Sequence, residues 1–165
     1  MARVIALGFL MGALSIAIFH QGTLFLLFHH ANAIPEATQV IGRVAAPGWD
    51  LSRMMPNPPF GLPVPLLLNQ MFWGGVWGIV IAAVLHATPA PDLLTGFLVG
   101  AVGCTLVAVT VVAGLKGLPP FAGGNVQTLL RAALVNGAFG WGTALMLRPA
   151  RLRSFRAAPL RPVRT

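Results

Sequence analysis

The chain is poor in charged residues, and above all in acids. Of its 165 residues 8% are charged, and Asp and Glu together number three. Soluble domains carry about 25% charged residues, so most of this surface must face something other than water. Glu36, Asp50 and Asp92 all lie between the long apolar runs. The lack of carboxylates within those runs argues against a carboxylate-driven proton pump, an acid–base enzyme and a divalent-metal site.

Cysteine is almost absent as well. Cys104 is the only one, and it lies in an apolar run. It excludes an intramolecular disulfide and a cysteine-based metal site, and we expect it to be a small buried hydrophobe. The chain also has no Gly-rich phosphate loop before a lysine, no serine with a partnered base and no convincing internal repeat of the transporter kind. We therefore predict a protein that is not an enzyme and holds no metal.

Long apolar runs are what the sequence does contain. A hydrocarbon core about 30 Å thick needs about 20 apolar residues in a helix. Four segments qualify, at about residues 4–28, 66–85, 93–115 and 128–147. The sequence therefore predicts an all-α membrane protein, a four-helix transmembrane bundle over residues 1–147. Arg131 is the only charged residue inside these spans, and we expect it to snorkel to the interface.

Basic residues set the expected orientation. Six of the eleven Lys and Arg residues lie in an Arg-rich tail at residues 148–165, and the positive-inside rule makes that side cytoplasmic. An even number of spans places the N-terminus there too. We thus expect a multi-pass protein of the bacterial inner membrane with both ends cytoplasmic. A basic tail beside an apolar segment indicates contact with anionic lipid headgroups, and we expect no nucleic-acid partner.

Residues 31–65 then form a long, Pro-rich periplasmic loop between the first two helices. Proline blocks helix formation, so we expect residues 56–65 to be extended. Two short interfacial helices are expected before them. One begins at Pro35 and Glu36, and Asp50 caps the other, over residues 51–55.

Small residues recur along every predicted helix at helical spacing. They are Gly8, Gly12, Ser15 and Gly22 in the first; Gly74 and Gly78 in the second; Gly96, Gly100, Gly103, Thr110 and Gly114 in the third; and Ala132, Asn136, Gly140 and Thr143 in the fourth. Small residues let helix backbones approach closely in lipid, so we predict a tight bundle. Trp73, Trp77 and Trp141 lie within the helices, and we expect their rings to fill space opposite glycine notches.

Polar side chains gather in the periplasmic half of the predicted bundle. His20 and Gln21 come from the first helix, Gln70 from the second and Asn136 from the fourth. Intramembrane polar groups are costly and suggest function. The alternative is that they only hydrogen-bond between helices, at about 0.6 kcal/mol each. We predict that these four residues converge, either as structural hydrogen bonds or as a site for a cofactor, a lipid headgroup or a solute.

Several phrases resemble a group of small bacterial, mainly proteobacterial, inner-membrane proteins without an assigned function. They are Phe19-His20-Gln21-Gly22-Thr23, Pro58-Pro59-Phe60-Gly61, Phe72-Trp73-Gly74-Gly75-Val76-Trp77-Gly78, Lys116-Gly117, Asn136-Gly137 and Gly140-Trp141-Gly142. The resemblance covers nearly the whole bundle but not the tail. It implies the membrane fold and no mechanism.

Three functional readings follow. The first is a non-enzymatic accessory or assembly subunit of a larger inner-membrane complex, with other membrane-protein subunits as partners. The second is a subunit that binds a lipid or a cofactor such as haem, a pigment or quinone, with His20 as the ligand. The third is a small-solute transporter that uses Gln21, Gln70 and Asn136. The sequence itself contains no motif that requires a cofactor.

Overall fold

The computed structural model describes residues 1–55 and 61–152, and in these ranges the fold is all-helical, without strands. The first helix runs from Ala2 to Ala33. Its parts are α1 (Ala2–Ser15), the π-helical η1 (Ile16–His20), α2 (Gln21–His29) and η2 (Ala31–Ala33). Then come α3 (Pro35–Ile41) and α4 (Leu66–Ala87). The third span comprises α5 (Asp92–Leu98), η4 (Val99–Cys104), α6 (Thr105–Val107), η5 (Ala108–Val112) and α7 (Ala113–Leu115). The chain continues as η6 (Pro120–Gly124), α8 (Val126–Leu147) and η7 (Arg148–Ala150).

Three of these helices are long and apolar enough to cross a membrane: Ala2–Ala33, Leu66–Ala87 and Asp92–Leu115. The all-α prediction is thus confirmed, whereas a fourth apolar span is not. α8 has 22 residues, as many as α4, but Arg131 and Asn136 make it more polar. α8 can be more polar than the other long helices because it packs against α1, α4 and α5. A helix among other helices can carry polar groups that face protein.

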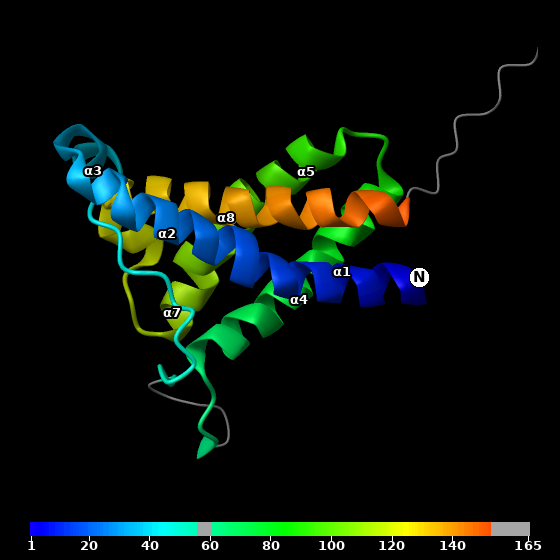
Figure 1. The fold of residues 1–165 in the computed structure, drawn as a ribbon, viewed down its shortest axis with the longest axis horizontal. Coiled ribbons are helices and arrows are strands. Elements are labelled where there is room, and N and C mark those ends of the chain that lie inside the picture. Colours follow the sequence, from blue (N-terminus) through cyan, green and yellow to red (C-terminus); the bar gives the residue numbers. More distant parts are fainter. Residues whose placement is uncertain (56–60, 153–165) are drawn as a thin grey trace, which may run out of the picture.

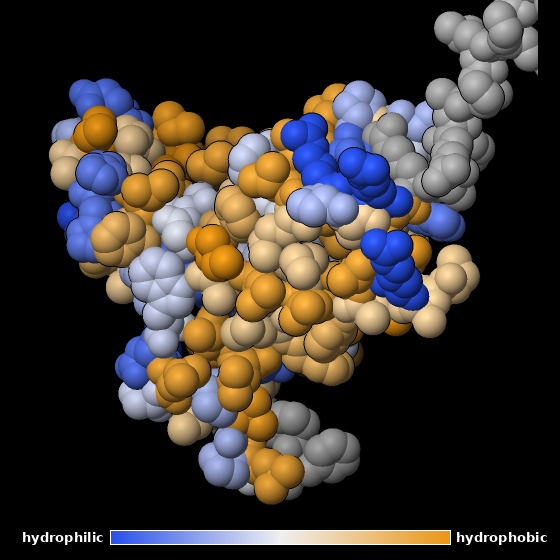
Figure 2. Space-filling view, turned by 45° about the vertical axis from the view of Figure 1, so that its right-hand side comes forward, coloured by the Kyte–Doolittle hydropathy of each residue, from blue (hydrophilic) through white to orange (hydrophobic). Residues whose placement is uncertain are grey.

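The N-terminus and the last described residues, 150–152, lie at one end of the bundle. The Arg3 guanidinium donates to the Ala150 carbonyl at 3.0 Å, and the His86 imidazole contacts the Leu152 carbonyl. We call this the terminal end. α3 and the connection from α7 to α8 lie at the opposite end, the loop end (Figure 1). On the face shown in Figure 2, apolar residues cover much of the middle, and many of the hydrophilic residues lie toward the ends.

The first helix (Ala2–Ala33) and α4 form hairpin 1, in which the backbones of α1 and α4 meet at glycines. A methyl group added at Gly12 would lie 2.2 Å from the Gly74 carbonyl oxygen, and one at Gly78 would lie 2.1 Å from the Gly8 carbonyl oxygen. Neither position leaves room for a Cβ. A further clash involves a side chain, because a methyl group at Gly75 would meet the Phe9 ring at 2.6 Å. The small-residue prediction is confirmed for this pair of helices.

Hairpin 2 consists of the third span and α8, and it uses the same geometry. A methyl group at Gly100 would lie 2.1 Å from the Asn136 carbonyl oxygen, and one at Gly140 would lie 2.1 Å from the Gly96 carbonyl oxygen. The ring of Phe97 faces Gly137 at 2.6 Å. Each of these contacts has its counterpart in hairpin 1.

The two hairpins are therefore an internal repeat, and the expectation of no repeat is wrong. The segment Gly8-Phe9-Leu10-Met11-Gly12-Ala13 matches Gly96-Phe97-Leu98-Val99-Gly100-Ala101 at every position but one. The second helices share fewer residue types, with Asn136 in the place of Gly74. The repeat is hard to see in the sequence, because the contacts conserve small size and not residue identity.

Equivalent positions of the repeat also make the contacts between the two hairpins. The Ser15 hydroxyl of hairpin 1 donates to the Phe139 carbonyl of hairpin 2 at 2.7 Å. In the reverse direction Gly103, which matches Ser15, faces the ring of Trp77, which matches Phe139, at 3.6 Å from an added methyl group. An approximate twofold relation between parallel hairpins explains both contacts.

Two expectations about packing are corrected. Trp77 does fill space opposite a glycine, but Trp73 is 56% exposed and Trp141 37% exposed. Phe19 instead occupies the notch at Gly142, and its ring lies 5.9 Å from that of Trp141 in an edge-to-face arrangement. The small-residue faces also end before the loop end, since Gly22 and Gly114 have open space around them.

The 31–65 connection matches its prediction in part. α3 begins at Pro35, with Glu36 in its first turn, as expected. The second short helix is absent. Instead Asp50 accepts from the Ser52 N–H at 2.8 Å in a turn, and the Met55 N–H donates to the Val64 carbonyl at 3.0 Å. Met54 and Pro65 thus form an isolated antiparallel bridge. Residues 56–60 lie outside the described part, as does the tail from 153 onward.

We predict that Gly12→Ala destabilises the bundle, whereas Gly22→Ala does not. The Gly12 methyl group would force the backbones of α1 and α4 apart, and overpacking of this kind costs about 1–3 kcal/mol or more. Gly22 has no atom within 4 Å of its added methyl group, so alanine there should gain up to about 1 kcal/mol of helix propensity. Thermal unfolding in detergent measures both. Equal melting temperatures for the two variants would contradict the close-contact interface.

Candidate functional site

The centre of the predicted polar layer is a hydrogen-bonded pair of glutamines. The Gln21 Nε2 donates to the Gln70 Oε1 at 2.8 Å, and the Gln21 Oε1 accepts from the Gly48 N–H at 2.7 Å. Gln21 is only 1% exposed. One side chain of the first helix therefore binds α4 and the 31–65 connection at once. The predicted meeting of Gln21 and Gln70 is confirmed.

A second bond ties the same stretch of the connection to the first helix. The Trp49 indole N–H donates to the Ala17 carbonyl at 2.7 Å. In an α-helix that carbonyl would accept from the Gln21 N–H, but in η1 this N–H bonds to Ile16 and Ile18 instead. The π turn thus releases an acceptor, and the indole takes it. The Trp49 ring also lies 5.8 Å from that of Phe25.

α8 holds the earlier part of the connection. The Arg131 Nη1 donates to the carbonyls of Ile41 at 2.8 Å and Arg43 at 3.0 Å, and the Gln127 Nε2 donates to the Gln39 carbonyl at 2.8 Å. Backbone carbonyls thus solvate the Arg131 guanidinium, a role that the predicted snorkelling to the interface did not include. The connection is anchored to hairpin 1 by Gln21 and to hairpin 2 by Arg131.

Asn136 does not appear in these bonds. Its Nδ2 donates to the Thr105 Oγ1 at 3.0 Å, between α8 and α6. Nearby, the hydroxyls of Ser15 and Thr143 both donate to the Phe139 carbonyl, at 2.7 and 2.9 Å. The layer is thus a set of separate hydrogen bonds, and in the described residues Gln21 and Asn136 have no polar partner in common.

His20 stands apart from the other three predicted residues. Its Nδ1 is buried and has no hydrogen-bond partner in the described part of the chain. It is a single ligand atom, and no cluster of three or more His, Cys, Asp or Glu residues capable of holding a metal occurs among the described residues. His20 fits the role of an axial ligand only for a group such as haem, in which the cofactor itself supplies the other bonds to the metal.

The anchoring role of the connection was missed at the level of sequence. The Gly48 N–H donates to the Gln21 side chain, and the Trp49 indole N–H donates to the Ala17 carbonyl, so each contact uses one backbone atom that residue type alone does not reveal. The sequence carries one signal of this role. Pro-Gly-Trp at 47–49 combines two helix-breaking residues with a tryptophan in the middle of the long loop. Further out, hydrogen bonds from the Ser52 hydroxyl and N–H hold the pKa of Asp50 below its usual value.

Comparison of the chain with protein-family models, with curated proteins and with solved structures finds no match. Function must therefore be inferred from the geometry described above.

We predict that Gln70→Leu lowers stability modestly and loosens the connection. The substitution leaves the buried Gln21 amide without its acceptor, which costs about 1–3 kcal/mol for an unsatisfied group, while the Gly48 bond to Gln21 stays. Hydrogen exchange at residues 46–50 should rise, and the melting temperature should fall by several degrees. Gln39→Leu is the matched control, since the Gln39 side chain is exposed and only its carbonyl is used. Unchanged exchange in the Gln70 variant would refute the anchoring.

Proposed function

We propose that this protein is a non-enzymatic accessory or assembly subunit of a larger inner-membrane complex. The proposal includes four membrane spans, with both chain ends on the cytoplasmic side and the loop end in the periplasm. The observation that carries it is the double anchoring of the 31–65 connection by Gln21 and Arg131. A long connection fixed at several points is a preformed surface, and preorganisation lowers the entropic cost of binding a partner.

The exposed residues of the connection support this reading. Trp49, Leu51 and Met54 are 44–55% exposed, although they lie in the connection and not within an apolar span. Exposed apolar residues inside the spans need no explanation, because lipid covers them. Outside the spans, adjacent apolar residues are typical of a surface that binds a partner.

The hydrogen bonds of the polar layer also favour binding over chemistry. Gln21, Gln70, Asn136 and Arg131 are all engaged by other groups of the chain. Residues that hold the fold together are poorly placed to bind and release a substrate. We therefore assign to them the task of positioning the connection.

The basic residues at the terminal end fit a cytoplasmic membrane surface. Arg148 and Arg151 are exposed, and Arg3 reaches the Ala150 carbonyl. Each Arg near an anionic leaflet contributes about 1 kcal/mol of attraction. Anionic headgroups are thus the lipid partner that we propose for this end, including the tail residues that lie outside the described part.

A cofactor-binding subunit is the second candidate, and one observation favours it. The buried Nδ1 of His20 has no hydrogen-bond partner among residues 1–55 and 61–152, so its lone pair is available to bind a cofactor. The absorption spectrum of the protein purified in mild detergent decides the matter. A visible band that His20→Ala removes would establish a bound chromophore, and a colourless wild-type protein would exclude haem and pigment.

We predict that reporter fusions near Pro56 and at Thr165 report opposite sides of the membrane. Four spans and the arginine-rich tail place residue 56 in the periplasm and residue 165 in the cytoplasm. A periplasm-active enzyme should work only at position 56, and a cytoplasm-active one only at 165. The same side for both positions would exclude an even number of spans with the termini inside.

We further predict that a photo-crosslinking residue at Leu51 or Met54 captures the same partner protein in intact membranes. The same residue at Leu106, which is 48% exposed within a span, is the control and should give only lipid adducts. Arg131→Gln weakens the anchor without touching either crosslinking position, so it should reduce both adducts several-fold. Different adducts at the two positions, or adducts that survive Arg131→Gln in a folded protein, would contradict the proposal.

A further inference from the structure

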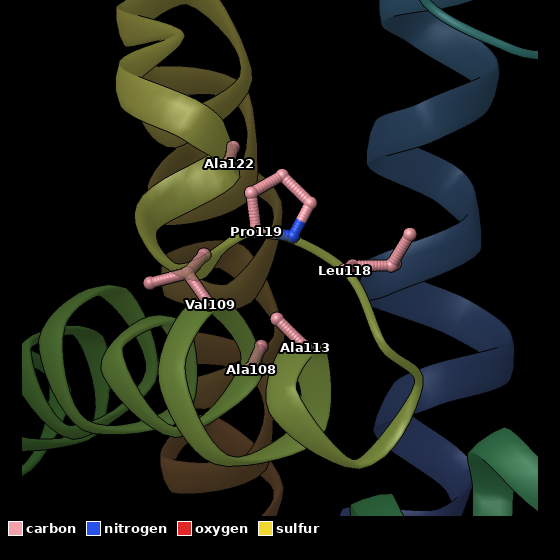
Figure 3. Close-up of a pocket in the computed structure, with 6 residues that line it drawn as sticks. All are labelled: Ala108, Val109, Ala113, Leu118, Pro119 and Ala122. Carbon is pink, nitrogen blue, oxygen red and sulfur yellow. The ribbon is translucent and has the colours of Figure 1, made fainter.

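Hairpin 2 carries a hollow at the loop end, with a volume of about 320 Å³. Its walls come from η5, α7 and the connection to α8 (Figure 3). The lining residues are Ala108, Val109, Ala113, Leu118, Pro119 and Ala122. All their side chains are apolar, so the hollow offers no side-chain hydrogen bond to a water molecule or to a polar ligand.

The internal repeat explains why this hollow exists. Ala108, Val109 and Ala113 occupy the positions that His20, Gln21 and Phe25 hold in hairpin 1. On hairpin 1 the connection covers that surface, through the Gly48 bond to Gln21 and the contact of Trp49 with Phe25. On hairpin 2 the side chains are smaller and the connection is shorter. The space that protein occupies in one half is thus open in the other.

The position of the hollow identifies its surroundings. α7 ends at Leu115, which is also the last residue of the third apolar span. Leu115 is 83% exposed, and Leu118, on the wall of the hollow, is 56% exposed. An apolar hollow at the end of a span lies where hydrocarbon meets headgroups. The medium that reaches it there is the acyl region of the bilayer.

A cation belongs to the chain segment that forms one wall of the hollow. Lys116 is exposed, and it lies in the turn between Ala113 and Leu118, two residues that line the hollow. The chain backtracks sharply there, with Gly117 at φ +66° and the Leu118 N–H bonded to the Ala113 carbonyl at 2.9 Å. The three acids of the chain lie in other connections, so no carboxylate next to Lys116 in sequence competes for its charge.

We propose that this hollow is a binding site for one anionic phospholipid. An acyl chain fills the apolar hollow, and the lipid phosphate pairs with the Lys116 ammonium. Charge complementarity selects an anionic headgroup over a zwitterionic one, whereas the hollow supplies affinity that is independent of the headgroup. The site lies at the end of the bundle opposite Arg148 and Arg151, and it does not depend on the proposed role as a subunit.

The test is native mass spectrometry of the full chain, after delipidation and addition of an equimolar mixture of phosphatidylglycerol and phosphatidylcholine. Ala108→Trp fills the hollow from an exposed position, and Leu106→Trp adds the same ring to the lipid-facing surface two residues away. Loss of a few buried methylenes corresponds to roughly tenfold weaker binding or more. We expect one phosphatidylglycerol per wild-type chain, unchanged binding in Leu106→Trp and at least tenfold less in Ala108→Trp.

Lys116→Gln separates the two parts of the site. It should keep a bound lipid but lose the preference for phosphatidylglycerol, and Lys116→Arg should restore that preference. Equal lipid binding by the Ala108 and Leu106 variants would overturn the site, since the lipid would then lie elsewhere. So would a preference for phosphatidylglycerol that survives Lys116→Gln, because the arginines at the terminal end would then be its source. Displacement of the lipid by a co-purifying protein, with loss of that protein in Ala108→Trp, would assign the hollow to a protein partner instead.

Discussion

Two helices can approach until their backbones touch only where no side chain stands between them, and in this protein that happens at glycines in both hairpins. Gly12 against Gly74, and Gly100 against Asn136, bring a carbonyl oxygen to within 2.2 Å of a methyl group added at the glycine. Association in lipid gains little from burying apolar surface, so van der Waals contact at such points supplies much of the stability. These contacts fix the point at which the two helices of each hairpin cross. The segments that pack on the hairpins are positioned by that crossing.

The repeat also shows which parts of the molecule are specialised. Position by position, the glycine contacts recur in both halves, whereas the polar contacts do not. Gln21 and Gln70 correspond to Val109 and Ala132, so hairpin 2 has no counterpart of the glutamine pair. Its counterpart surface is the apolar hollow beside Lys116. The shared glycine contacts build the bundle, and the unshared contacts distinguish the two halves at the loop end: an anchored connection covers one half, and an apolar hollow opens in the other.

Much of the fold follows from the sequence, because its signals are local. Apolar runs gave the helices to within a few residues, Pro35 and Glu36 gave α3, and the small-residue spacing gave the interhelical contacts near Gly12 and Gly100. The errors share a different cause. The exposure of Trp73, the bond of Asn136 to Thr105 and the docking of Trp49 on Ala17 all depend on which helix faces which. Hydropathy along one chain does not contain that information, and the acceptor at Ala17 exists only because η1 is a π turn.

The connection docks on the first helix close to the point where α4 begins. A helix of 32 residues is about 48 Å long and one of 22 residues about 33 Å. With Gly12 held against Gly74, the extra length of the first helix projects beyond the start of α4 toward the loop end. Just before this projecting part, level with the first turns of α4, the first helix carries the buried Gln21 and the Ala17 carbonyl, polar groups that lipid cannot satisfy. Residues 48 and 49 supply the missing partners, so the connection is as much a part of the membrane domain as the helices that it joins.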